Sequence, residues 1–216
     1  MLTRVLSVLL LVVAGFALQP ARASQRADFG QEQPSADARQ VAEWVLESAD
    51  HGGQPFVIVD KLRSRVFVFD AAGRLQGATP ALIGSARGDE SVPGIGQRKM
   101  SSILPSERTT PAGRFVASLE RSLQGDDILW VDYDAAIALH RVITTVPAER
   151  RLQRLDSRTV DDRRITYGCI NVPVKFFEQV VAPLFRASAG IVYVLPENRP
   201  AREYFGSHAA RTGDSR

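Results

Sequence analysis

The chain has 216 residues, a formal net charge of +3 and a single cysteine. Its first 23 residues carry Arg4 and Arg22 and no acid, so without them the net charge falls to +1. So small a basic excess argues against a nucleic-acid binder, and one cysteine excludes an internal disulfide. The remaining length suits one domain with a full core.

Residues 1–23 have the pattern of a secretory signal. One positive charge lies within 1–4, an almost wholly apolar run covers 5–18, and Ala21-Arg22-Ala23 supplies the small residues of a cleavage site. The apolar run is too short to cross a bilayer comfortably. We expect an exported, periplasmic protein with no stable membrane insertion after cleavage, the alternative being an uncleaved N-terminal anchor.

The predicted elements follow in chain order. Ser35 caps a helix from Ala36 to about Ala49, whose apolar residues recur at helical spacing. Strands are expected at 55–60, 65–70, 75–85, 114–119 and 128–133, and the apolar run 135–139 leads into His140. The polar segment 86–110 is a long loop, of the kind that is usually functional or mobile. Beyond it, Pro173 starts a helix to about Phe185 that Pro183 bends or ends, and the last strand covers 191–195.

Cys169 stands in the segment 165–173, between a predicted strand and a predicted helix start. Backbone amides and the helix dipole at such a junction lower the pKa of a thiol, and the same amides can bind an oxyanion. Gly168 permits a tight turn or a close approach of substrate. In an oxidising compartment, this lone thiol is either buried and inert or kept for its reactivity.

A thiol nucleophile needs a base, and the chain offers three histidines. His51 lies in a glycine-rich loop and His208 in the predicted tail. His140 closes an apolar run 29 positions before Cys169 and is the natural partner. The alternative is a histidine that is merely hydrogen-bonded. One cysteine and three scattered histidines have no metal-site spacing, so we expect no metal and no cofactor.

Four segments in order carry a family resemblance. The stretch Thr166-Tyr167-Gly168-Cys169-Ile170-Asn171 resembles the Ser/Thr-His-Gly-Cys-x-Asn/Arg signature of L,D-transpeptidase (YkuD-like) catalytic domains. The segment 110–115 is similar to the family's Thr-Pro-x-Gly-x-Phe, 57–69 to its opening hairpin and 191–195 to its closing strand. The resemblance covers roughly residues 55–196.

The resemblance implies a fold and a chemistry. The fold is mainly β, a mixed sandwich-like pair of sheets with flanking helices, with a leader and helix over 24–54, the catalytic domain over 55–196 and a polar tail over 197–216. Cys169 is the nucleophile and His140 the base, and Gly168, Tyr167, Thr166 and Asn171 support the oxyanion and the site. The implied activity is that of a monomeric enzyme of cell-wall biogenesis and cell shape, which forms 3→3 cross-links between peptidoglycan stem peptides.

Three departures from the family pattern leave other activities open. Tyr167 replaces the usual histidine, Arg141 replaces the commonly small residue after the base, and the stretch between base and nucleophile is long. An L,D-carboxypeptidase or an amidase acting on peptidoglycan peptides is one alternative. A non-catalytic wall-binding protein of the same fold is another.

Two further features have both a functional and a plain interpretation. The segment 141–164 carries seven arginines and four acids. It is either a lid that meets substrate carboxylates, with Arg164 and Arg141 as the candidates, or a solvated loop whose charges pair internally. Asn171 either supports the site, as the resemblance implies, or caps the following helix.

Overall fold

The computed structural model describes residues 26–122 and 124–205. The predicted signal segment 1–23 and His208 lie outside these ranges. Within them, no helix has both the length and the apolar character that crossing a membrane requires.

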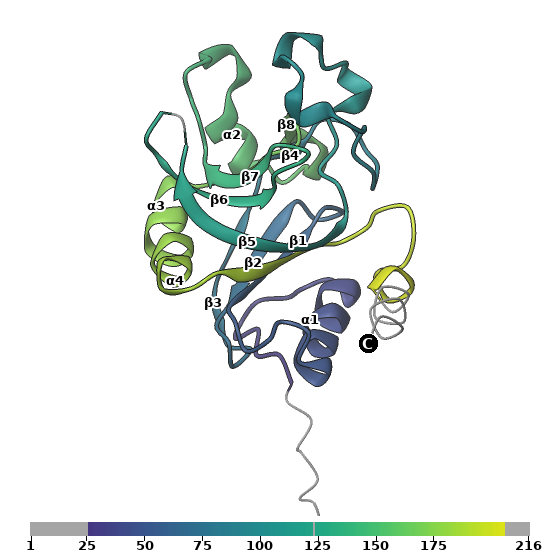
Figure 1. Ribbon diagram of the computed structural model, residues 1–216, viewed down its shortest axis with the longest axis vertical. Helices are drawn as coiled ribbons and strands as arrows, with labels where there is room; N and C mark the ends of the chain where they lie inside the picture. The colour runs from purple at the N-terminus through teal and green to yellow at the C-terminus, as the bar shows by residue number, and fades with distance from the viewer. Residues whose placement is uncertain (1–25, 123, 206–216) are drawn as a thin grey trace, which may run out of the picture.

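Eight strands form one mixed sheet in the order β3-β2-β1-β10-β5-β6-β7-β9 (Figure 1). Their bounds are β1 Phe56–Asp60, β2 Arg65–Phe69, β3 Leu75–Pro80, β5 Gly113–Arg121, β6 Asp127–Asp132, β7 Ile137–Arg141, β9 Ile170–Val172 and β10 Gly190–Val194. Two short strands, β4 (Ile83–Gly84) and β8 (Arg164–Thr166), pair separately. The prediction of a mainly β fold is therefore confirmed.

Strand β5 joins the two halves of the sheet and makes the fold sandwich-like. Its first half, 113–117, pairs with β10, whereas its second half, 118–121, pairs with β6. The strand sweeps from one layer to the other in Figure 1. One core cluster is therefore shared by β1, β2 and β10 on one side and by β6, β7 and β9 on the other.

The central strands are buried on both faces, which explains their continuous apolar runs. In β1, Val57 and Val59 face the core between the two layers, whereas Phe56 and Ile58 face a second core under α1 (Ala36–Ser48). The Ser35 hydroxyl caps α1 by accepting a hydrogen bond from the Ala38 amide at 3.1 Å, as the sequence predicts.

The helix after Pro173 continues further than its sequence suggests. It comprises α3 (Val174–Phe176), a π-helical turn (Phe177–Val181) and α4 (Ala182–Ala187). Pro183 does not end this run, which continues to Ala187; the π-helical turn lies directly before it, where the hydrogen-bond pattern of the helix is shifted. A second difference concerns the strand expected over residues 75–85, which is two separate strands in the structure, β3 and β4.

The described part of the predicted polar tail, 197–205, packs against the domain instead of leaving it. Ala201 and Phe205 are buried in the core beside α1. The Tyr204 hydroxyl donates to the Ala112 carbonyl at 2.8 Å. Apolar residues recur at helical spacing after Pro200 and bury this segment. The many charged residues between them made this pattern hard to recognise in the sequence.

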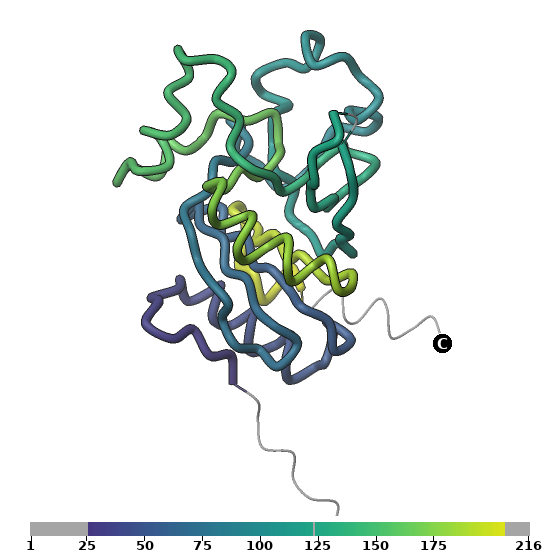
Figure 2. The backbone as a smooth tube through the Cα atoms, turned by 90° about the vertical axis from the view of Figure 1, so that its left-hand side faces the viewer, coloured from purple at the N-terminus to yellow at the C-terminus, as the bar shows by residue number. Residues whose placement is uncertain are grey.

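Two irregular segments project from the same end of the molecule in both views (Figures 1 and 2). The first, residues 86–110, contains three short turns, Ile95–Gln97, Met100–Ser102 and Pro105–Glu107. The second, residues 142–163, contains Pro147–Glu149, α2 (Arg151–Asp156) and Val160–Arg163. Leu155 anchors α2 to Leu82 and Val142 in a small core of its own.

Candidate active site

Cys169 lies in a tight loop between β8 and β9. The residue after it begins a buried strand that runs parallel to β7, and the first helical residue is Val174. The helix therefore begins beyond β9 and not at the cysteine, so the thiol does not lie at its N-terminus. The helix itself follows Pro173 as predicted, but a strand of three residues, β9, separates it from the cysteine.

Gly168 adopts a conformation that only glycine accommodates. Its φ is +133°, and a Cβ at this position would lie 2.5 Å from Ile137 Cδ1 and 2.7 Å from the Thr109 carbonyl oxygen. The glycine thus permits the turn that the sequence predicted, and it also permits the close approach of a neighbouring backbone, which was not predicted.

Two threonines hold the loop that carries the nucleophile. The Thr166 hydroxyl donates to the Cys169 carbonyl at 2.6 Å and accepts from the Gly168 amide at 3.1 Å. The buried Thr110 hydroxyl donates to the Gly168 carbonyl at 2.7 Å and accepts from the Gly84 amide at 2.9 Å. Three of these four hydrogen bonds hold the backbone of Gly168 and Cys169, and the fourth ties Thr110 to Gly84.

Strand register brings His140 to the same face as the cysteine. His140 pairs with Asn171 between β7 and β9, and the Asn171 side-chain amide lies 3.0 Å from His140 Nε2. Cys169 is two positions before Asn171, and side chains two apart along a strand share a face. His140 Nδ1 lies 2.8 Å from the Arg141 carbonyl oxygen.

Burial favours the neutral forms of both the thiol and the imidazole. Burial raises the pKa of the Cys169 thiol, and a backbone hydrogen bond from Ala138 and the charge of Arg151 only partly offset this. Burial also lowers the pKa of His140. The Cys169 thiol points to the Ala136 carbonyl oxygen at 3.7 Å, and in the described part of the chain no hydrogen bond joins it to His140.

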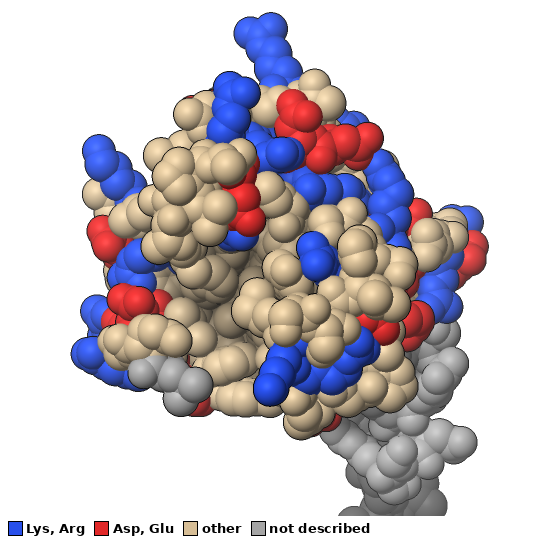
Figure 3. All heavy atoms as spheres, turned by 90° about the horizontal axis from the view of Figure 1, so that it is seen from above, with Lys and Arg blue, Asp and Glu red and all other residues tan. Residues whose placement is uncertain are grey.

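Two hollows meet at Cys169 and His140. The first, about 270 Å³, is lined by polar groups that include Arg151, Glu149 and Tyr167. The second, about 520 Å³, is mostly apolar, with Ile128 and Trp130 along it. Seen from this end, the surface is hollowed between uncharged atoms, with both basic and acidic side chains around the hollow (Figure 3).

Of the other predicted site residues, Tyr167 and Arg141 line the hollows and Arg164 does not. Tyr167 lines the first hollow, with the Arg108 guanidinium stacked 3.9 Å above its ring. Arg141 lines the second hollow, but it is engaged by Glu178 at 3.1 Å and by the Asp127 carbonyl at 3.0 Å. Arg164 lines neither hollow, because its side chain is buried against Glu197 at 2.5 Å.

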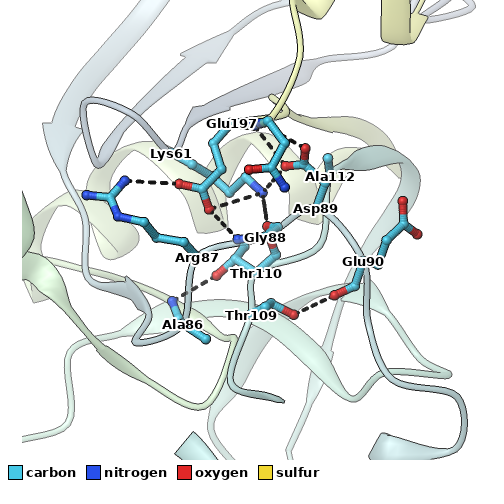
Figure 4. Close-up of polar contacts among 12 residues, drawn as sticks. Lys61, Ala86, Arg87, Gly88, Asp89, Glu90, Thr109, Thr110, Ala112 and Glu197 are labelled. Atoms are coloured by element: carbon cyan, nitrogen blue, oxygen red, sulfur yellow. Dashed lines mark hydrogen bonds and ion pairs between the residues drawn. The ribbon is translucent and has the colours of Figure 1, made fainter. Parts of the chain in front are cut away.

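That buried pair belongs to a larger ion cluster, Lys61, Asp89, Arg164 and Glu197, which supports the nucleophile loop. Figure 4 shows how Lys61, Asp89 and Glu197 of this cluster face one another. Lys61 is 1% exposed and donates to the Gly88 and Thr110 carbonyls and to Asp89 at 2.6, 3.0 and 2.8 Å. Since Thr110 in turn binds Gly168, the cluster ties the projecting 86–110 segment and the C-terminal segment to the loop that carries Cys169.

Sequence reasoning missed two residues of this site. Thr110 stood in the quoted segment 110–115, so its place in the motif was the available signal, although its partner Gly168 was not foreseeable. Arg151 lines the first hollow and donates to the Asn171 side-chain oxygen, Oδ1, at 2.8 Å. Nothing in the sequence distinguishes it from the other arginines of the segment 141–164.

No protein-family model matches the chain, and no curated protein matches it. Among solved structures, it is similar to the helical cell shape determining protein of Campylobacter jejuni, with 15% identity and a TM-score of 0.46 over 68% of this chain and 49% of that one. It is also similar to the catalytic domain of the Enterococcus faecium L,D-transpeptidase, with 15% identity and a TM-score of 0.38 over 66% and 98%.

A third similar structure is L,D-transpeptidase 1 of Mycobacterium tuberculosis, with 16% identity and a TM-score of 0.35 over 65% of this chain and 60% of that one. The chain thus spans about half the length of the first of these three proteins and under two thirds of the third. Most of the similar structures are L,D-transpeptidases, the family that the motifs resemble.

Proposed function

We propose that the protein is an exported peptidoglycan L,D-transpeptidase with Cys169 as nucleophile and His140 as general base. The observation that carries the proposal is the position of Cys169, beside His140 and at the junction of two hollows. A transpeptidase needs such an arrangement, because an acyl donor and an acyl acceptor must reach one sulfur from different sides.

The first half-reaction forms a thioester. The thiol turns from the Ala136 carbonyl towards His140 and replaces the Asn171 amide at the single lone pair of Nε2. Nε2 then takes the thiol proton as sulfur attacks the carbonyl of the third stem residue. The Gly168 amide is already committed to Thr166, and in the described chain the Cys169 amide has no such partner. The Cys169 amide is therefore the oxyanion donor. Collapse breaks the peptide bond, and His140 protonates the departing amine of D-Ala.

The second half-reaction regenerates the thiol. The side-chain amine of a second stem enters through the other hollow and attacks the thioester carbonyl, while His140 takes the proton that the amine loses. Expulsion of the thiolate leaves a new amide, the 3→3 cross-link, and the proton returns to sulfur. Attack by water in place of the amine would instead release a trimmed tripeptide.

The products of a single incubation distinguish the candidate activities. Purified protein is incubated with a disaccharide-tetrapeptide and analysed by mass spectrometry beside a Cys169→Ala control. Dimers that have lost one D-Ala, absent from the control, are the expected result. Tripeptide monomers alone would indicate a carboxypeptidase. An unchanged substrate would favour the wall-binding alternative and contradict catalysis on this stem.

Export is a separate part of the proposal and has its own test. The charged start, the apolar run 5–18 and the small residues 21–23 support signal cleavage after Ala23. Protein from a periplasmic extract should begin at Ser24 when its N-terminus is sequenced. Protein that keeps Met1 and sediments with membranes would contradict cleavage and indicate an N-terminal anchor.

A further inference from the structure

Arg151 is the arginine of the projecting segment 142–163 that enters the candidate active site. It is the first residue of α2, which Leu155 packs onto the sheet. Its side chain is only 14% exposed. Nε binds Glu149 at 2.6 Å, and Nη1 binds the Asn171 side-chain oxygen at 2.8 Å. Two such contacts hold the guanidinium in one orientation.

The hydrogen bonds around Asn171 allow only one arrangement of protons. A guanidinium donates and never accepts, so the Asn171 atom facing Arg151 is the oxygen, and its NH₂ faces His140. An NH₂ group donates, so His140 Nε2 carries the lone pair. The Arg141 carbonyl accepts only, so Nδ1 carries the proton. Nε2 is thereby set as the basic nitrogen on the face that bears Cys169.

We propose that Arg151 is a positioning residue of this site, which fixes the side-chain amide of Asn171 and through it the tautomer and protonation of His140. The inference rests on the proposed roles of Cys169 and His140. It also gives α2 a function distinct from that of a lid, because Arg151 acts on His140 through Asn171 and makes this contact without substrate.

Charges on several elements face His140, and Arg151 is the cation that acts on both His140 and the thiol. Burial is the main cause of the lowered pKa of His140; the Arg141 carbonyl and Asp126 oppose it, and Arg151 reinforces it. Arg151 also lowers the pKa of the Cys169 thiol, against the effect of burial. Glu149, already paired with Arg151, and Tyr167 line the first hollow, and Asp127 and Arg141 line the second.

Removal of Arg151 should therefore raise both pKa values. The loss of the positive charge favours the imidazolium and disfavours the thiolate. In addition, an unheld Asn171 amide can turn its oxygen towards Nε2, where it accepts a hydrogen bond from the protonated ring. The thiolate fraction at neutral pH falls, and alkylation of Cys169 slows with it.

The test measures thiol reactivity and the histidine tautomer without any peptidoglycan. Alkylation of full-length Arg151→Gln by iodoacetamide is timed from about pH 5 to about pH 10, the range in which imidazole and thiol titrate. The matched control is Arg154→Gln, which changes a partly buried arginine on α2 that binds the Glu149 and Asp162 carbonyls and lines neither of the two hollows. Nitrogen NMR, assigned with His140→Gln, reports which ring nitrogen carries the proton.

The proposal expects Arg151→Gln to react about fivefold more slowly than Arg154→Gln at pH 7, with its rate profile displaced to higher pH. It also expects Nε2 of His140 to become protonated at a higher pH in that variant than in the control, while Nδ1 keeps its proton on the Arg141 carbonyl. Arg151→Lys, which keeps the cation, should give an intermediate rate and remains informative if the glutamine variant does not fold. Rate profiles and Nε2 titrations equal to those of the control in both variants would overturn the proposal.

Because neither readout uses a stem peptide, failure of this inference is distinguishable from failure of the proposed function. Alkylation rates that differ as expected, with every stem left intact, would support the positioning role of Arg151 and contradict the transpeptidase assignment. Cross-linked stems, with Arg151→Gln equal to its control, would support the assignment and contradict the role of Arg151.

Discussion

At the residue scale, the candidate nucleophile is placed by backbone contacts around Gly168. The turn requires φ of +133°, and the space for a Cβ is taken by Ile137 and by the backbone at Thr109. The motif was recognisable in the sequence because it is local. The reason for its glycine became visible only when segments nearly 60 residues apart, Thr110 and Gly168, were seen in contact.

Gly168→Ala should both destabilise the fold and impair the thiol. The methyl group would overlap Ile137 Cδ1 and the Thr109 carbonyl, and strain of this kind costs about 1–3 kcal/mol. Urea unfolding measures the cost. Gly52→Ala is the control, since its φ is also positive, at +61°, but nothing lies within 4 Å of the added carbon. Equal losses in both variants would show that close packing at Gly168 contributes nothing.

Thr110→Val should cost about 1–3 kcal/mol, because it leaves the Gly168 carbonyl and the Gly84 amide without their shared partner while keeping the side-chain shape. Thr110→Ser keeps the hydroxyl and should lose much less. Urea unfolding and the rate of Cys169 alkylation are measured together. If the serine variant behaves like the valine variant, the methyl group and not the hydroxyl holds the loop.

At the scale of elements, continuous apolar runs were correctly predicted as strands because β1 and β10 are buried on both faces. The stretch around Cys169 was harder, since β8 and β9 are three residues each and pair with strands distant in the chain. Local pattern carries no information about such pairing. The same limit hid Arg151, whose role depends on α2 meeting Asn171 across 20 residues of sequence.

The buried ion cluster connects elements that share no local sequence signal. Lys61→Met should destabilise the protein by about 3–5 kcal/mol, because Asp89 would remain buried without its cation, whereas Glu197 would keep Arg164. The control is Arg74→Met, which breaks a pair of similar length on an arginine that is 71% exposed and should cost less than about 1 kcal/mol. Unfolding by guanidinium measures the loss of stability in both variants, and equal losses would contradict a structural role for the cluster.

At the scale of the whole molecule, the candidate site lies where the two layers and both projecting segments meet. Strand β9 supplies Asn171, β7 supplies His140, and Thr110 reaches Gly168 from the start of β5. The ion cluster fastens the C-terminal segment to this end of the sheet, as Figure 4 shows. Stability of the fold and geometry of the nucleophile loop therefore depend on the same buried charges.

This dependence gives acid pH a specific effect on the whole domain. Burial raises the pKa of Asp89, but the hydrogen bond from Lys61 and those from the Glu197 and Asn198 amides outweigh it, so the pKa lies below its ordinary value. The folded protein thus releases the Asp89 proton more readily than the unfolded chain does. Its contribution to stability is complete above about pH 5 and is lost as the pH falls through the ordinary carboxyl range towards the lower folded pKa.

Urea unfolding measured at a series of pH values between about 6 and about 2, the interval in which carboxyl groups titrate, tests this dependence. Asp89→Asn should be less stable than the parent at pH 6, and the difference should shrink as the pH falls, because the parent loses what the variant already lacks. Asp156→Asn changes an exposed carboxylate on α2 and should follow the parent throughout. A constant difference between Asp89→Asn and the parent down to pH 2 would mean that Asp89 stabilises the fold by its shape and hydrogen bonds alone, independently of its charge.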